Sequence, residues 1–379
     1  MPALYTELSV SAQTAYMQLF EAALNAEHSR SVADLNGSFS SKKVRNRRYW
    51  YFQYFEIDGS LRQIYVGPDT DRVRQLSARA RTAGAADRLE PLARAAASLG
   101  CATAARRHGR VLRRLAEYGF FKAGGLLIGT HAFLAYGNLF GVRWDNPNLT
   151  QDIDFAHAGK SVSLALPSNL QVQTADAISS LDMGFLPIST LSGKAGGTFL
   201  NPDEPEFRLD FLTTRHRGGQ TPFVHPQLGI ALQPLPFMEF SLEHVEQAVV
   251  FSTEHVVLVN VPDPARFALH KLIVFGERSG AFRLKAAKDL AQAAQLISWL
   301  WAHRRDTLLA ALDDLASRGK GWTSRFNTGV TAMERAYPAL VTDADLRDAF
   351  AVKPTRSTKT APRATVSKKP GRRRRNPSA

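Results

Sequence analysis

This chain of 379 residues lacks long apolar runs and has almost no cysteine. The single cysteine, Cys101, cannot form a disulfide within the chain, and its Ala-rich surroundings favour an inert, packed side chain. A zinc site would need several ligands from elsewhere. No apolar run reaches the roughly 20 residues needed to cross a bilayer, so we expect no membrane partner. Residues 1–7 lack the basic and apolar segments of a secretory signal, and we therefore expect a cytoplasmic location.

Acidic residues are absent after Asp348, whereas the segment from Lys353 to Arg375 contains ten basic residues. This segment supplies +10 of the formal net charge of +14, so the rest of the chain is nearly balanced. Its richness in Pro, Ser and Thr predicts a disordered basic tail over residues 351–379. Arg372–Arg375 could bind the phosphates of RNA, such as tRNA, without sequence preference. A solubilising end without a partner is the alternative.

Periodicity and turn signals predict an N-terminal region, residues 1–118, of helices with an aromatic β-hairpin. We expect helices over 8–30, from about 69 to 98, and over 103–118, and hairpin strands at Arg48–Ile57 and Leu61–Gly67 around a turn at 58–60. The hairpin has aromatic residues on both faces, and one face is expected to pack in a core. For the other face we favour packing in a core or against a domain. The alternative is stacking on nucleic-acid bases, with the neighbouring basic residues beside them.

Shorter apolar segments follow and predict an α+β fold with a small mixed sheet over residues 119–262. We expect strands at 123–129, 150–155, 207–212 and 255–261, a helix at 131–140, and loops or hairpin tips at 193–197 and 217–220. After Pro262, apolar residues at helical spacing predict a C-terminal helical domain, residues 263–350. Its helices are expected at 265–276, 281–301 and near 303–318, 322–337 and 343–350.

Two aspartates, Asp152 and Asp154, flank a single apolar residue. On a strand their side chains share one face, with Ile153 and Phe155 directed to the core. Asp210 lies within another apolar run, where an unpaired carboxylate would be costly. Solvated carboxylates, or pairing of Asp210 with Arg208 or Arg215, would explain this pattern without a ligand. A shared divalent cation such as Mg²⁺ is the other explanation, because hard cations prefer oxygen ligands.

Residues that could hold phosphate groups accompany the carboxylates. Gly129 and Thr130 stand between an expected strand and helix, where free N–H groups suit a phosphate, although such a pair is often only a turn. Lys271 lies in an apolar helix, a place where lysine is rare without a partner or ligand. Lys285 and Lys288 share one face of the next helix, which could also be merely solvated. Arg143 is a further candidate for binding phosphate groups.

The pattern Ile128-Gly129-Thr130, Asp152-Ile153-Asp154 and a later Asp210 resembles the nucleotidyltransferase superfamily typified by DNA polymerase β. A bacterial nucleotidyltransferase-like family with an N-terminal aromatic hairpin is more similar, over roughly residues 36–300. The matching segments are Gly37–Phe39, Arg48–Gln53, Tyr65–Pro68, Arg266–Leu272 and Lys285–Ala293. Residues 143–154 also resemble abortive-infection-type nucleotidyltransferase toxins. Two departures are Thr130, in place of Gly or Ser, and an insertion near residues 137–148 that must loop out.

The resemblance implies the chemistry. Asp152, Asp154 and Asp210 would be the catalytic and metal-binding residues, holding two Mg²⁺ ions, with Mn²⁺ as a substitute. The substrate would be an NTP, whose NMP is transferred to an acceptor hydroxyl on RNA, tRNA, a protein or a small molecule. A role as a toxin or in phage defence is compatible with it. The alternative is a catalytically inactive, nucleic-acid-binding regulator or antitoxin on the same scaffold. The sequence indicates no particular protein partner.

Overall fold

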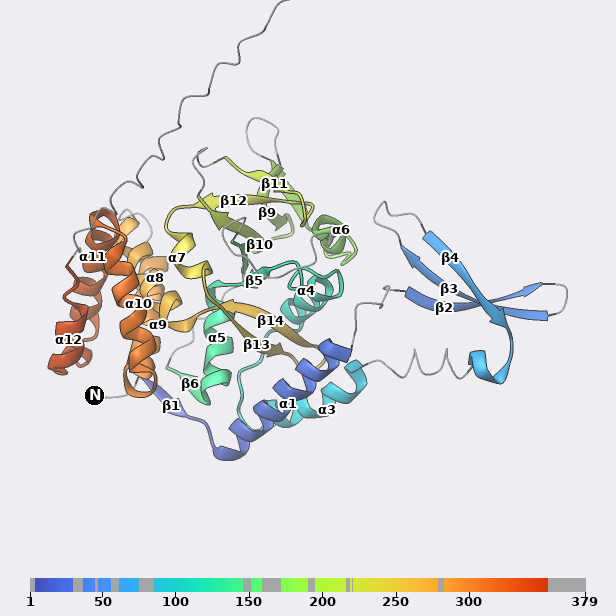
Figure 1. Ribbon diagram of the computed structural model, residues 1–379, viewed down its shortest axis with the longest axis horizontal. Coiled ribbons are helices and arrows are strands. Elements are labelled where there is room, and N and C mark those ends of the chain that lie inside the picture. Colours follow the sequence, from blue (N-terminus) through green and yellow to red (C-terminus); the bar gives the residue numbers. More distant parts are fainter. Residues whose placement is uncertain are drawn as a thin grey trace, which may run out of the picture.

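A computed structural model describes residues 4–29, 37–44, 47–55, 61–74, 85–145, 151–158, 172–189, 195–215, 219, 221–278 and 283–353. The fold is α+β, as expected, with a mixed sheet, a group of C-terminal helices and a small N-terminal sheet (Figure 1). Arg372–Arg375 and nearly all of the predicted basic tail lie outside the described residues. Among the described helices, none has both the length and the apolar character of a membrane span.

The central sheet has seven strands with mixed directions. Its main path runs β11-β12-β10-β7-β5, β9 pairs with β10, and β8 pairs with β9. Strand β10 pairs in parallel with β7 and β12 and antiparallel with β9, while β5 is antiparallel to β7. The bounds are β5 Gly125–Leu127, β7 Ile153–His157, β8 Leu186–Ser189, β9 Ala195–Asn201, β10 Glu204–Thr214, β11 Phe223–His225 and β12 Ile230–Leu235.

Alternation along β7 and β10 separates the core from the polar face, as predicted for Ile153 and Phe155. Both of these side chains are fully buried, as is Phe211 on β10. The rings of Phe155 and Phe211 stack with centroids 5.0 Å apart, and Phe120 meets both edge-on. Burying each such ring contributes about 1.5–3 kcal/mol. The core therefore holds the two strands in register and directs their aspartates to the opposite face.

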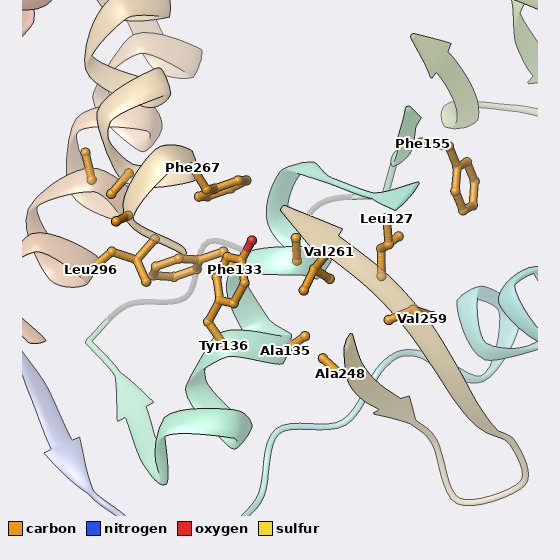
Figure 2. Packing of buried hydrophobic residues seen from close by; sticks show 14 of the residues in the cluster. Leu127, Phe133, Ala135, Tyr136, Phe155, Ala248, Val259, Val261, Phe267 and Leu296 are labelled. Carbon is orange, nitrogen blue, oxygen red and sulfur yellow. The ribbon is translucent and has the colours of Figure 1, made fainter. Parts of the chain in front are cut away.

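Helix α5 (Gly129–Phe140) connects the sheet to the C-terminal helices. It packs between the hairpin of β13 (Val245–Phe251) and β14 (Val256–Pro262) and the helices that follow (Figure 2). The hydroxyl of Tyr136 donates to the carbonyl oxygen of Pro262 at 2.7 Å, and its ring meets Phe267 at 5.4 Å. The hydrophobic core extends on both sides of residue 262.

The C-terminal helices follow the predicted periodicity closely. They are α8 Pro264–Glu277, α9 Arg283–His303, α10 Arg305–Ser317, α11 Lys320–Ala336 and α12 Ala344–Phe350. Asp263 caps α8 by accepting from the N–H of Arg266, with Pro264 at the first helical position. The five helices α8 to α12 form one group in Figure 1, packed against α7 (Met238–Leu242) and one another.

Helices also cover the outer side of the β13–β14 hairpin. Helix α1 (Val10–Ser29) packs beside α3 (Ala85–Ser98), and both contact β14. Tyr16 is buried there and its hydroxyl hydrogen-bonds the backbone of Val249. Cys101 is buried in the same cluster, which raises the pKa of its thiol and fits the expectation of an inert side chain. Helices α4 (Arg106–Glu117) and α6 (Thr174–Ser179) flank the central sheet.

The N-terminal sheet, defined as β2 (Gly37–Val44), β3 (Arg47–Phe55) and β4 (Leu61–Pro68), is antiparallel and lies apart from the other elements in Figure 1. The hairpin strands were predicted, whereas β2, a polar segment, was not. Its polar sequence forms a strand because β3 supplies hydrogen-bond partners along its whole length. Of the long helix expected from residue 69, only residues 71–74 and α3 are described as helical, and the predicted turn at 58–60 lies outside the described residues.

Two segments expected to be loops form strands instead. Residues 195–197 begin β9, where a Cβ on Gly197 would lie 2.5 Å from the carbonyl oxygen of Phe211. Glycine is needed there because β9 approaches the neighbouring backbone so closely. Of the expected insertion, residues 137–140 complete α5, and β6 (Val142–Trp144) pairs with β1 (Tyr5–Glu7). Of the loop predicted at 217–220, only Gly219 is described.

Candidate active site

Three carboxylates meet on the polar face of the central sheet. Asp210 lies directly opposite Asp154 in the parallel β10–β7 pair, and Asp152 precedes β7 by one residue. One oxygen from each of the three aspartates lies within 4.8 Å of the others. The structure thus brings together Asp152, Asp154 and Asp210, hereafter the triad. Such a group of hard oxygen donors suits a divalent cation of the Mg²⁺ class.

Gly129 lies against the triad. Its φ is +64°, and a Cβ placed on it would lie 2.1 Å from Oδ2 of Asp154. The N–H of Ile128 also donates to the carbonyl oxygen of Asp154 at 2.9 Å. Glycine is therefore required here for two reasons, its left-handed backbone and its close approach to a carboxylate. The N-terminus of α5 begins at this glycine, so free helix N–H groups stand beside the triad.

Burial and mutual repulsion act against the ionised form of Asp154 in the triad. Burial raises the pKa of Asp154 from 3.8 to about 6, with repulsion from Asp152 and Asp210 adding to the effect, and Lys271 and Lys285 opposing it. A bound cation would relieve this repulsion. The donor set and its charge therefore fit a divalent metal.

Two polar side chains orient Asp210. The hydroxyl of Thr198, opposite it on β9, donates to Oδ1 of Asp210 at 2.6 Å. On the other side, the guanidinium of Arg208 lies 3.3 Å from Asp210 and 3.7 Å from Asp152. The sequence suggested the arginine only as an ordinary ion-pair partner, and Thr198 was missed because it lies in a segment partly expected to be a loop.

The candidate lysines lie on α8 and α9. Lys271 donates to Oδ1 of Asp289 at 2.8 Å, and Arg278 also pairs with this buried aspartate. Lys271 thus has a protein partner, one of the two explanations for a lysine in an apolar helix. Burial lowers the pKa of Lys288, as does Lys271, whereas Asp152 and Asp154 raise it. Together with Lys285, these lysines place positive charge within electrostatic reach of the triad.

Thr130 and Arg143 take different positions. Thr130 is buried in the first turn of α5, beside Gly129. Arg143 is exposed on β6, opposite Thr6, beyond the far end of α5. A helix of 12 residues is about 18 Å long at 1.5 Å per residue. The structure therefore does not bring Arg143 to the glycine turn, because α5 separates the two.

A family model described as nucleotidyltransferase matches residues 106–317, more than half of the chain. The chain belongs to this nucleotidyltransferase family. The resemblance to nucleotidyltransferases stated from the motifs is thereby confirmed. No curated protein matches the chain. Among solved structures it is similar to an antigenic nucleotidyltransferase-like protein from Paracoccidioides brasiliensis, at 14% identity over 66% of this chain and 96% of that one, with a TM-score of 0.31. That likeness is too low to argue from.

A buried histidine pair is a further feature of this nucleotidyltransferase that the sequence did not signal. His131, in the first turn of α5, lies 2.9 Å from His108 of α4 through ring nitrogens. Burial lowers the pKa of His131 to about 3 and that of His108 to about 4. Both rings are therefore neutral at physiological pH, and the pair joins α4 to the start of α5 without adding charge beside Asp152.

Proposed function

We propose that this nucleotidyltransferase transfers an NMP from an NTP to an acceptor hydroxyl in a Mg²⁺-dependent reaction. The observation that carries the proposal is the convergence of three carboxylates beside a glycine-initiated helix N-terminus. Asp152 and Asp154 would hold two Mg²⁺ ions and Asp210 would complete the second site, with Mn²⁺ as a possible substitute. When bound, the metal would neutralise triphosphate charge and lower the pKa of the acceptor hydroxyl.

The chain's own residues would position the substrate. Free N–H groups at Gly129 and Thr130 suit the phosphate oxygens of an NTP. Lys271, Lys285 and Lys288 would add counter-charge to the triphosphate and to the pyrophosphate released when its α–β bond breaks. Asp210 or solvent would accept the proton of the attacking hydroxyl. Positioning and charge neutralisation supply most of the catalysis in reactions of this type. Arg143 is the weakest of the candidates for triphosphate binding, because it lies beyond the opposite end of α5.

Labelled NTPs incubated with cellular RNA and protein would test the proposal. The wild-type protein with Mg²⁺ is expected to label an acceptor, and Asp154→Ala to lose labelling by about a hundred- to a thousandfold, as when a group essential to transition-state charge is removed. Asp313→Ala, which removes an exposed carboxylate on α10, is the matched control and should behave as wild type. Equal labelling by wild type and Asp154→Ala would contradict the site.

The acceptor class and the biological role are finer parts of the proposal. RNA or tRNA is the acceptor favoured by the basic residues Arg372–Arg375. Mass spectrometry of RNA and protein after expression, compared with Asp154→Ala, would identify it. Growth arrest on expression, relieved by Asp152→Ala, would support a toxin or phage-defence role. Calorimetry with NTP and Mg²⁺ addresses the inactive-regulator alternative, which predicts no metal-dependent heat.

A further inference from the structure

The N-terminal sheet has an unusual composition for an exposed element. Its three strands contain 25 residues, of which eight are aromatic, five are Lys or Arg and none is Asp or Glu. Sheets of this size are stabilised by burying one face. The two faces must therefore be considered separately.

One face is covered by the chain that follows β4. Trp50 is buried there, and its indole N–H donates to Oδ1 of Asp69 at 2.8 Å. Gly67, opposite Trp50, has Val73 within 3.4 Å of the place where a Cβ would stand. Residues 69–74 therefore pack on the Trp50 face.

The other face presents tyrosines. Tyr51 lies opposite Tyr65 in the β3–β4 pair, and Tyr49 is two residues away on the same face. The ring centroids are 5.7 Å apart for Tyr51 and Tyr65 and 6.2 Å for Tyr49 and Tyr65. Tyr65 is 55% exposed, more than a core role would allow. The rings form a continuous aromatic surface.

Basic side chains border this tyrosine face. Lys42, paired with Tyr49 across β2 and β3, lies 5.4 Å above the ring of Tyr51. It also donates to Oε1 of Gln63 at 2.7 Å, which holds it over the sheet. Arg47 is exposed and shares the face, because it precedes Tyr49 by two residues. A single ligand on this face can therefore stack on the aromatic rings and contact the positively charged side chains beside them.

We propose that this tyrosine face, comprising Lys42, Arg47, Tyr49, Tyr51 and Tyr65, binds single-stranded nucleic acid. Bases stack on aromatic rings whatever their identity, while lysine and arginine bind the backbone phosphates. The charge is complementary, because the sheet strands carry no carboxylate. The idea that this face holds an acceptor strand rests on the proposed function. Binding of nucleic acid to the face can nevertheless be measured without any transfer reaction.

Fluorescence anisotropy of the full chain with a labelled oligouridylate tests the proposal. Tyr65→Ala and Tyr51→Ala are each expected to weaken binding about tenfold, and Tyr65→Phe to bind as wild type, because it keeps the ring. Lys42→Ala should reduce the slope of log affinity against log salt by about one. Lys320→Ala, an exposed lysine on α11, is the matched control and should leave the slope unchanged. An oligodeoxythymidylate distinguishes DNA from RNA as the preferred strand.

Three results would contradict the proposal that the tyrosine face binds single-stranded nucleic acid. They are undetectable binding at low salt, equal affinity of wild type and Tyr65→Ala, and equally strong competition by duplex RNA. The last two would assign binding to charge alone, such as that of Arg372–Arg375, which every variant retains. Strong binding by both wild type and Asp154→Ala, without labelling by either, would contradict the proposed transfer and leave the surface standing.

Discussion

In both the central sheet and the N-terminal sheet, side chains alternate between a buried face and a polar face. The polar faces of the two sheets carry opposite charge. In the first, β7 and β10 bury aromatic rings on one face and gather three aspartates on the other. In the second, Trp50 is buried and the tyrosine face carries Lys42 and Arg47. A face crowded with carboxylates suits cations, whereas aromatic rings with cations suit bases and phosphates.

The two faces also differ in how firmly their side chains are positioned. Asp210 accepts a hydrogen bond from Thr198 and forms an ion pair with Arg208, and its strand is anchored by fully buried Leu209 and Phe211. Tyr65 is mostly exposed and is held by ring contacts. Precise geometry is needed for nucleotidyl transfer and much less for stacking on unpaired bases. The variants below separate these two demands.

Among variants that keep all three carboxylates, the largest effect is expected from Gly129→Ala. The added methyl would collide with Oδ2 of Asp154 and also strain a backbone with φ of +64°. Displacing a catalytic group by about 1 Å can cost about a hundredfold in rate. We therefore expect kcat to fall at least about a hundredfold, measured by NMP transfer from labelled NTP.

Gly100→Ala is the control for backbone strain. Gly100 has φ of +100°, yet a Cβ there meets nothing within 4 Å. It should lose about 1–3 kcal/mol of unfolding free energy, and keep its transfer rate. If Gly129→Ala loses only stability, the close approach to Asp154 does not matter for transfer.

The next largest effect is expected in how the unfolding free energy of the protein changes with pH, measured in EDTA. Because the pKa of Asp154 is raised to about 6 in the folded protein, the metal-free native state holds a proton that the unfolded chain has released between pH 4 and 6. The unfolding free energy therefore falls as pH rises through this window, by at most about 3 kcal/mol. Urea unfolding of wild type and Asp154→Asn would measure it.

Asp154→Asn should flatten this part of the profile, because it has no carboxylate to titrate. Adding Mg²⁺ to the wild type above pH 6 should restore stability, since a bound cation favours the ionised triad. An identical fall in wild type and Asp154→Asn would assign the dependence to other groups. The same measurement on the tyrosine-face variant Tyr65→Ala should retain the wild-type profile.

Strong local patterns explain what could be predicted from the sequence. Apolar residues around Asp154 and Asp210 placed both on strands with one buried face, and the period of two then placed both carboxylates on the other. Helical spacing after Pro262 predicted α8 to α12 for the same reason.

The predictions that failed concern features that depend on pairing between segments distant in sequence. Strand β2 is polar, and β9 starts with small residues, so neither shows alternation, and each forms because a neighbouring strand completes its hydrogen bonds. Thr198 could not be found without β9. Arg143 was named as a further phosphate-binding candidate, but the length of α5 separates it from the glycine turn.

A smaller effect is expected from Arg208→Ala. The guanidinium lies beside Asp152 and Asp210, where an arriving cation must compete with it. The arginine is 37% exposed, so the ion pairs are partly screened by solvent. Removing it should tighten Mn²⁺ binding about two- to fivefold, as measured by calorimetry without NTP. Arg94→Ala, which breaks an exposed pair with Glu90, is the control and should change nothing. Weaker Mn²⁺ binding by Arg208→Ala would instead show that the arginine supports the triad.

The smallest expected effect completes the comparison, because the two faces should act independently. Tyr65→Ala is expected to bind Mg²⁺–NTP as wild type does, and Asp154→Ala to bind oligouridylate as wild type does. The double variant should then show the sum of the single effects to within about 0.5 kcal/mol, as for sites without shared partners. Calorimetry with Mg²⁺–NTP and anisotropy with oligouridylate on all four proteins would measure this. A larger coupling would mean that nucleic acid held on the N-terminal sheet alters the triad, so that acceptor binding and nucleotide binding are linked.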